Sequence, residues 1–242
     1  MPAALGDFCR PPGGHAIVVS PEIIIESDRM LHDHVFCQDC EDIFNKGGET
    51  WILPLLARLN TGFPLYDILV KQPPSQVFGE TKVYLAAKNP EIQADKLIHF
   101  AMGIFFKGTV HSWSGNSTEL WIDLGPYIEP LRTFLLGETF FPERMFLTAG
   151  VLPWPHRAIE FCYPYPDPTG KKFNYRFHAC GVQFVLEVGK TVTAESRTGC
   201  FASNPFHPVL LTDFTKSVQL PFREAIKTTR IAKNVEKWMK KG

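Results

Sequence analysis

The sequence carries no net charge and no long hydrophobic run. Its 25 Lys and Arg residues equal its 25 Asp and Glu residues, so no overall positive field draws nucleic acid to the molecule as a whole. No stretch reaches the roughly 20 apolar residues that a membrane-spanning helix needs, and residues 1–10 contain no apolar run long enough for a signal peptide. We therefore expect a cytoplasmic protein without a membrane partner.

The sequence also lacks the short motifs of several enzyme classes. It contains no G-x-S-x-G elbow, no G-x-x-x-x-G-K-[ST] loop and no H-E-x-x-H pair, which are motifs of serine hydrolases, P-loop nucleotide hydrolases and zinc peptidases. Hydrolysis by a serine nucleophile stays open, because catalytic triads are scattered along a sequence.

Aromatic and β-branched residues are unevenly distributed, and this distribution predicts the fold. Helical periodicity dominates to about residue 136 and includes a helix over residues 90–113, whose middle, residues 98–110, is apolar on nearly every side. Strand-like segments then follow at 145–151, 157–163, 173–177 and 182–188. Because helices and strands are segregated along the chain, we expect an α+β fold with an antiparallel β meander.

The expected organisation has two parts. An N-terminal segment, residues 1–48, carries a metal-binding turn, and residues 49–242 form a single α+β domain. In the second part we expect a helix over residues 128–136 and a C-terminal helix over residues 221–242.

The strongest signal for chemistry is the C-x-x-C pair of Cys37 and Cys40. This spacing brings two thiolates to one point, which is half of a tetrahedral zinc site. A chain with six cysteines and no export signal uses them as thiols or metal ligands rather than in disulfides. The candidates for the remaining ligands are His34, His32, Cys9 and His15. The alternatives are two buried thiols, or a redox pair, which the lack of a βαβ pattern around the motif disfavours.

A wider pattern surrounds this pair. It comprises Cys37, Cys40, Glu41 and Phe44, followed by Tyr66, Asp67 and the apolar helix to Trp113. In these features the chain resembles a family of uncharacterised bacterial proteins related to HNH endonucleases, which carry a treble-clef zinc knuckle near the N-terminus. The resemblance implies zinc as a cofactor, DNA or RNA as a partner, and a nucleic-acid-associated function that includes a degenerate or metal-dependent nuclease.

The chain departs from that family at two points. The first C-x-x-C of the family is missing, and only Cys9 stands near its expected place. The Ser-His-Ile-Ile-Pro-like strand of the family is also missing, and residues 18–23 are its nearest counterpart. Because an HNH nuclease needs a histidine to activate water and a divalent ion on the scissile phosphate, no catalytic residue is assigned.

Basic residues are concentrated at the end of the chain. Residues 214–242 hold eight basic residues against two acidic ones, a net charge of +6. A basic terminal helix of this kind contacts phosphate in some proteins, and the candidate nucleic-acid-binding residues are Lys237, Lys240 and Lys241. The alternative is a helix face that is simply solvated.

Two other interpretations of the function rest on different residues. His178 and Cys180 are two residues apart on an expected strand and hence on one face, which matches a Cys–His nucleophile pair. The corresponding function is a small-molecule hydrolase of esters or lactones with a histidine in its active site. The alternative is that His178 and Cys180 are a half-buried pair without chemistry, since such a pair has the same sequence pattern. His99 and His111 are interpreted as core histidines of the long helix. A structural or partner-binding protein without enzymatic activity is the third interpretation.

Overall fold

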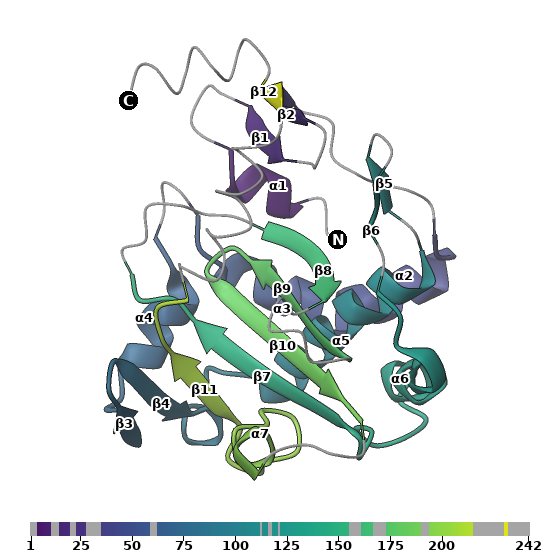
Figure 1. Ribbon diagram of the computed structural model, residues 1–242. Helices are drawn as coiled ribbons and strands as arrows, with labels where there is room; N and C mark the ends of the chain where they lie inside the picture. The colour runs from purple at the N-terminus through teal and green to yellow at the C-terminus, as the bar shows by residue number, and fades with distance from the viewer. Residues whose placement is uncertain are drawn as a thin grey trace.

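The computed structural model of the protein describes residues 4–10, 15–19, 23–27, 35–58, 62–111, 113–115, 118–120, 122–154, 161–166, 173–189, 194–214 and 230–231. Within these residues a seven-stranded mixed sheet lies against a group of helices (Figure 1). The expected α+β fold is confirmed.

The large sheet draws its strands from most of the chain. They are β3 (Gln76–Phe78), β4 (Thr81–Leu85), β7 (Met145–Val151), β8 (Phe161–Pro166), β9 (Asn174–Ala179), β10 (Val182–Val188) and β11 (Pro208–Leu211). Their spatial order is β3-β4-β11-β7-β10-β9-β8. Neighbouring strands are antiparallel except β11 and β7, which are parallel, with Val209 opposite Ala149.

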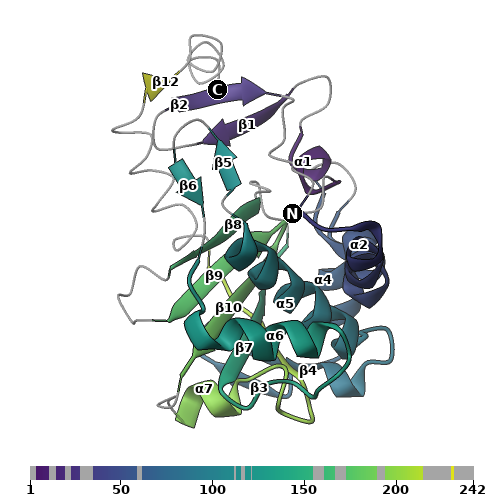
Figure 2. The same ribbon diagram turned by 90° about the vertical axis from the view of Figure 1, so that its right-hand side faces the viewer.

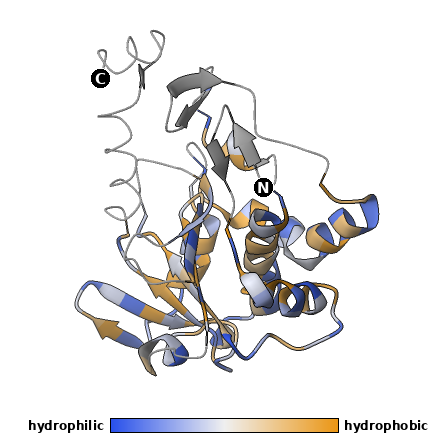
Figure 3. Cartoon of the chain, turned by 45° about the vertical axis from the view of Figure 1, so that its right-hand side comes forward, coloured by the Kyte–Doolittle hydropathy of each residue, from blue (hydrophilic) through white to orange (hydrophobic). Residues whose placement is uncertain are grey.

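Helix α5 (Ala94–Val110) packs on the inner face of this sheet. Its Phe100 and Phe105 rings meet Phe177 of β9 at 6.3 and 5.0 Å between centroids, and Phe177 stacks on Phe184 of β10 at 5.0 Å. Burying a side chain of this kind contributes about 2–3 kcal/mol, so this aromatic cluster joins the helix layer to the sheet. Figure 2 shows the two layers from the side, and Figure 3 shows hydrophobic residues along the helices and inner strands.

A second helical run crosses α5 at close range. It consists of α2 (Gln38–Phe44), the π-helical turn η1 (Asn45–Glu49), α3 (Thr50–Ile52) and the 3-10 turn η2 (Leu53–Leu55). A Cβ on Gly48 would lie 2.4 Å from the carbonyl oxygen of Lys96, and one on Gly47 would lie 2.2 Å from the His99 ring. The two glycines therefore allow η1 to lie directly against α5.

The remaining elements surround this two-layer core. The helices are α1 (Ala4–Phe8), α4 (Pro64–Val70), η3 (Ala86–Lys88), η4 (Gly125–Tyr127), α6 (Ile128–Leu135) and α7 (Ala194–Thr198). A small sheet joins β1 (Ala16–Val19), β2 (Ile23–Ser27) and β12 (Arg230–Ile231), and a hairpin joins β5 (Trp113–Gly115) to β6 (Thr118–Leu120).

Several predicted elements are confirmed. The helix expected over residues 90–113 is α5, which is shorter at both ends, so that Trp113 begins strand β5 instead. The helix expected over residues 128–136 is α6. The strands expected at 145–151 and 182–188 are β7 and β10 with the same bounds. The other two expected strands begin later, as β8 and β9.

Three expectations need correction. The antiparallel meander covers only β8, β9 and β10, because β7 pairs with β10 rather than with β8. The turn expected at Cys37–Cys40 is the start of α2, which runs without a break into η1. The expected C-terminal helix over residues 221–242 lies outside the described residues except for Arg230 and Ile231, which form strand β12 instead.

In the part of the chain that the structure describes, no helix is both long enough and apolar enough to cross a membrane.

Candidate functional site: the Cys37–Cys40 pair

The first turn of α2 brings two thiols together at the surface. Cys37 is the residue that caps the helix, with extended backbone angles (φ −69°, ψ 165°), and Cys40 is the third residue of the helix. Their sulfur atoms lie 3.4 Å apart. The Cys37 side chain is exposed and that of Cys40 is half-buried, so a ligand or reagent has direct access to Cys37.

Contacts on both sides of the pair hold it in place. Phe36, just before Cys37, packs on Phe44 and Phe106 with ring centroids 5.2 and 6.0 Å apart. Glu41, just after Cys40, forms a 3.4 Å ion pair with the Lys107 ammonium group of α5. The sulfur positions are therefore set by the contact between α2 and α5 rather than by the turn alone.

Lys107 is itself buried at this contact. Its Nζ donates to Glu49 Oε1 at 2.9 Å, and only 7% and 8% of the two side chains are exposed. The same Nζ lies 4.4 Å from the centroid of the Phe44 ring. This ion pair was not predicted from the sequence, because 58 residues separate its two charges and no local motif joins them.

The two thiols differ in their ionisation. The pKa of Cys37 is lowered, chiefly by the backbone N–H of Cys40 and then by the Cys40 thiol. The pKa of Cys40 is raised, chiefly by its hydrogen bond to Cys37 and then by partial burial. Of the two thiols, Cys37 therefore ionises more readily than Cys40.

The structure brings together only part of the expected zinc ligand set. His32 and His34 lie outside the described residues. The sulfur of Cys9 lies 3.8 Å from that of Cys180 rather than beside the Cys37–Cys40 pair. Among the residues that the structure describes, which include Cys9 and His15, no group of three or more His, Cys, Asp or Glu side chains is arranged to hold a metal ion.

The pair of cysteines nevertheless fits half of a tetrahedral zinc site. Two sulfur ligands at the usual 2.3 Å from one tetrahedral zinc ion lie about 3.8 Å apart. The observed distance between the sulfur atoms is 3.4 Å, so a small side-chain rotation suffices. Two thiols at this distance can also form a disulfide by rotation alone.

His178 and Cys180 are not paired in the way expected of a nucleophile and its base. Cys180 lies in the turn after β9 with φ +42°, and its sulfur faces Cys9 and the Leu5 carbonyl. The His178 ring stacks on Tyr165, whose hydroxyl lies 3.1 Å from Nε2. Burial lowers the pKa of His178 to about 3.

The two histidines of the long helix, His99 and His111, lie at positions that suit a role in packing rather than in catalysis. His99 is directed at the end of α6, with its Nε2 3.1 Å from the Leu135 carbonyl oxygen, and burial is the main cause that lowers its pKa. His111 caps the C-terminal end of α5 and is half-buried. The interpretation of His99 as a core histidine agrees with these contacts.

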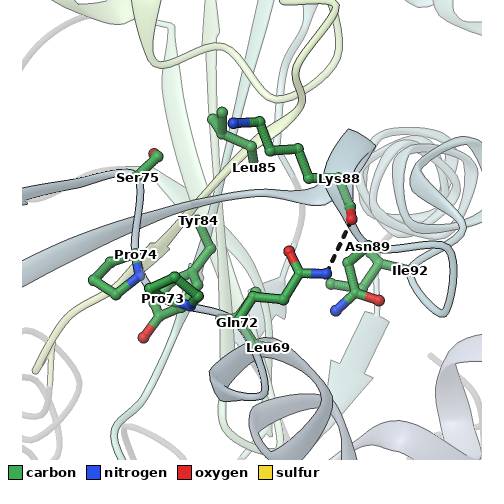
Figure 4. Close-up of a pocket in the computed structure, with 10 residues that line it drawn as sticks. All are labelled: Leu69, Gln72, Pro73, Pro74, Ser75, Tyr84, Leu85, Lys88, Asn89 and Ile92. Atoms are coloured by element: carbon green, nitrogen blue, oxygen red, sulfur yellow. Dashed lines mark hydrogen bonds between the residues drawn. The ribbon is translucent and has the colours of Figure 1, made fainter.

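A cleft of about 260 Å³ lies between α4, β4 and η3 (Figure 4). Two of its polar side chains bond to backbone groups: Gln72 donates to the Lys88 carbonyl at 3.0 Å, and Asn89 donates to the Ile68 carbonyl at 3.1 Å. The remaining lining is mostly apolar, including Leu69 and Ile92. The amide groups of Gln72 and Asn89 are therefore already hydrogen-bonded within the protein.

Comparison with known proteins adds no relative. No family model, no curated protein and no solved structure matches the chain. The candidate site therefore rests on its geometry and chemistry.

Proposed function

We propose that the protein is a nucleic-acid-associated zinc protein, in which Cys37 and Cys40 supply two ligands of one structural zinc ion. The observation that carries the proposal is the 3.4 Å approach of the two sulfur atoms on one helical turn. The lowered pKa of Cys37 favours metal binding, because the thiolate and not the thiol is the ligand.

His34 and His32 are the proposed nitrogen donors. They precede Cys37 by three and five residues, a separation short enough for both to reach an ion held by the cysteines. Cys9 is not part of the proposed set, because its sulfur lies against Cys180. When bound, the ion would link the segment before Phe36 to the start of α2.

Metal content tests the zinc proposal. We expect the full chain, purified without chelators, to contain about one zinc per molecule by elemental analysis, as a single tetrahedral site requires. Cys37→Ser should abolish this zinc content, and Cys200→Ser should retain it, because Cys200 is buried away from the pair. A wild-type protein with no zinc after growth in zinc-containing medium would contradict the proposal.

The nucleic-acid part of the proposal rests on the net charge of +6 in residues 214–242. Lysines that neutralise phosphates release counterions, so binding weakens as salt concentration rises. Replacement of Lys237, Lys240 and Lys241 by Glu should weaken binding to duplex DNA or RNA. It should also flatten the salt dependence by about 0.9 in log–log slope for each DNA phosphate that the variant no longer neutralises.

Lys82→Glu on β4 is the control, since it changes the net charge by the same kind of substitution far from the C-terminal segment in sequence. Lys82→Glu changes the net charge by −2 and the triple variant by −6, so equal losses of log affinity per substituted lysine would indicate an effect of net charge alone. Absence of binding at low ionic strength would leave zinc binding as the remaining part of the proposal.

A further inference from the structure

The Cys37–Cys40 pair has a second chemistry that does not require a metal. Its two thiols are in contact at 3.4 Å on one helical turn, and one of them is exposed to solvent. Formation of a disulfide between them needs rotation of the side chains, and the C-x-x-C spacing keeps the Cα atoms within one turn of helix. Contacts of Phe36 and Glu41 anchor the chain on both sides of the pair, so these contacts hold the two thiols close together.

The exposure of the two sulfurs assigns them different roles. A disulfide that approaches from solvent reaches Cys37, whereas Cys40 is half-buried behind it. The thiolate is the attacking form in exchange reactions, and the exposed sulfur of Cys37 is the one that an incoming disulfide meets first. Cys40 Sγ lies 3.4 Å from Cys37 Sγ, close enough to attack a mixed disulfide formed there.

We propose that Cys37 and Cys40 form a redox-active dithiol that reduces small-molecule disulfides by thiol–disulfide exchange, with Cys37 as the attacking and Cys40 as the resolving cysteine. The inference rests on the sulfur geometry and is independent of the proposed zinc binding.

The reaction balances in two steps. The Cys37 thiolate attacks one sulfur of a disulfide R–S–S–R, a Cys37–S–S–R bond forms, and the first R–S⁻ leaves and takes a proton from water. Cys40 then loses its proton to solvent and attacks Cys37 Sγ, which expels the second R–S⁻. Two electrons pass from the dithiol to R–S–S–R, which becomes two R–SH molecules, and the protein retains a Cys37–Cys40 disulfide.

A second close thiol pair among the described residues, Cys9 and Cys180, provides an internal comparison. Cys9 and Cys180 have sulfur atoms 3.8 Å apart, but Cys180 is fully buried and Cys9 is only half-exposed. A solvent disulfide has no direct path to Cys180. We therefore expect exchange at this pair to be slower than at Cys37.

The experiment uses the full chain, freed of metal with EDTA, and glutathione disulfide. The protein is equilibrated in buffers with a series of ratios of reduced to oxidised glutathione, quenched with acid, alkylated and digested with trypsin. Both cysteines lie in the tryptic peptide of residues 30–46. We expect this peptide to change, over the series, from the doubly alkylated form to an internal disulfide.

Single substitutions identify the role of each sulfur. Cys40→Ser should accumulate glutathione on Cys37, because the resolving thiol is missing. Cys37→Ser should lower the initial rate of reaction with glutathione disulfide about tenfold or more, because the accessible thiolate is removed. Cys200→Ser should behave as the wild type, since Cys200 is buried.

A doubly alkylated peptide throughout the series, or a Cys40→Ser protein without a glutathione adduct, overturns the inference. A parallel series with added zinc separates it from the zinc proposal. If zinc binds, it should slow oxidation of the pair; if zinc has no effect, the zinc proposal fails and the dithiol inference stands. Cys37 is exposed, so loss of reactivity in Cys37→Ser with an unchanged melting temperature reports on chemistry and not on unfolding.

Discussion

Lys107 places a charged group inside the contact between α2 and α5. Its ammonium group lies 2.9 Å from Glu49, and both side chains are less than a tenth exposed. A buried ion pair adds little stability relative to a well-packed apolar pair, but removal of one partner leaves the other charge buried and unpaired. Glu41 is paired with the same ammonium group, but its side chain is 39% exposed, so its carboxylate loses less of its hydration than that of Glu49.

Lys107→Met should therefore lower the free energy of unfolding by about 3–5 kcal/mol, because the Glu49 carboxylate would stay buried. Glu41→Gln should change it by about 1 kcal/mol or less. The double variant Lys107→Met/Glu49→Leu should recover most of the stability. Urea denaturation of the three variants measures these differences, and equal effects of Lys107→Met and Glu41→Gln would contradict the assignment.

His178 makes stability depend on pH. Its pKa in the folded protein is about 3, lowered by burial from 6.5. Between these values the unfolded chain binds a proton that the folded protein does not, so the free energy of unfolding falls as pH falls through this range. From pH 7 to pH 5 the stability falls by about 2 kcal/mol through this group.

His178→Gln should remove this part of the pH dependence, because glutamine does not titrate. Its free energy of unfolding should decline by about 2 kcal/mol less than that of the wild type between pH 7 and pH 5. Urea denaturation at the two pH values gives the comparison. Parallel declines in the two proteins would show that His178 accepts a proton in the folded state.

At the scale of elements, the close approach of η1 to α5 depends on a missing side chain. Helix propensity alone predicts that Gly48→Ala stabilises a helix by about 1 kcal/mol. The structure predicts the opposite sign, because the new Cβ would lie 2.4 Å from the Lys96 carbonyl oxygen and 2.7 Å from the Phe100 nitrogen, and backbone atoms cannot move aside. We expect Gly48→Ala to lower the free energy of unfolding by about 2–4 kcal/mol.

Lys46→Ala on the same turn is the matched control, since its side chain is 80% exposed, and it should change stability by about 1 kcal/mol or less. Thermal or urea denaturation compares the two variants. A Gly48→Ala protein at least as stable as the wild type would mean that η1 does not lie against α5 as described.

Helix α5 gives a second prediction at this scale. Ile104 is 1% exposed, whereas Val110 on the same helix is 42% exposed. Ile104→Asp places an unpaired carboxylate in the core and should cost about 4 kcal/mol or more, whereas Val110→Asp should cost about 1 kcal/mol or less. Melting temperatures measure the contrast, and similar values for the two variants would refute the central position of α5.

Local patterns predicted those elements whose signal is contained in their own residues. The bounds of β7 and β10 followed from their aromatic and β-branched runs, and α5 followed from its apolar length. Helix α4 was missed, because it is only seven residues long and begins at a proline. Strand β11 was missed because its four residues are defined by the strands on either side of it.

The candidate site likewise combines features that local sequence predicts with features that depend on long-range packing. The C-x-x-C spacing identified Cys37 and Cys40, because a helical turn is local. The start of α2 at Gln38 was not predicted, since it depends on packing of Phe36 and Phe44 against α5. The ion pair of Lys107 with Glu49 was not predicted either, because it also depends on contact between segments that are distant in sequence.

At the scale of the whole molecule, Leu5 of α1 and Phe44 of α2 belong to the same hydrophobic core as the strands of the large sheet. We therefore expect the described parts to unfold together. Tryptophan fluorescence and far-UV circular dichroism should give coincident urea transitions, as a two-state protein requires. A separate early transition would indicate that residues 1–48 form an independent unit.

The central place of β11 has a consequence for synthesis on the ribosome. β11, at residues 208–211, lies between β4, at residues 81–85, and β7, at residues 145–151. When the nascent chain has emerged only to residue 190, β7 to β10 can already pair with one another. The β3–β4 hairpin, although made much earlier, has no strand to join. The β3–β4 hairpin therefore cannot join β7 to β10 in one sheet until β11 has been translated, because β11 is the last strand of the large sheet in sequence and lies between the two groups.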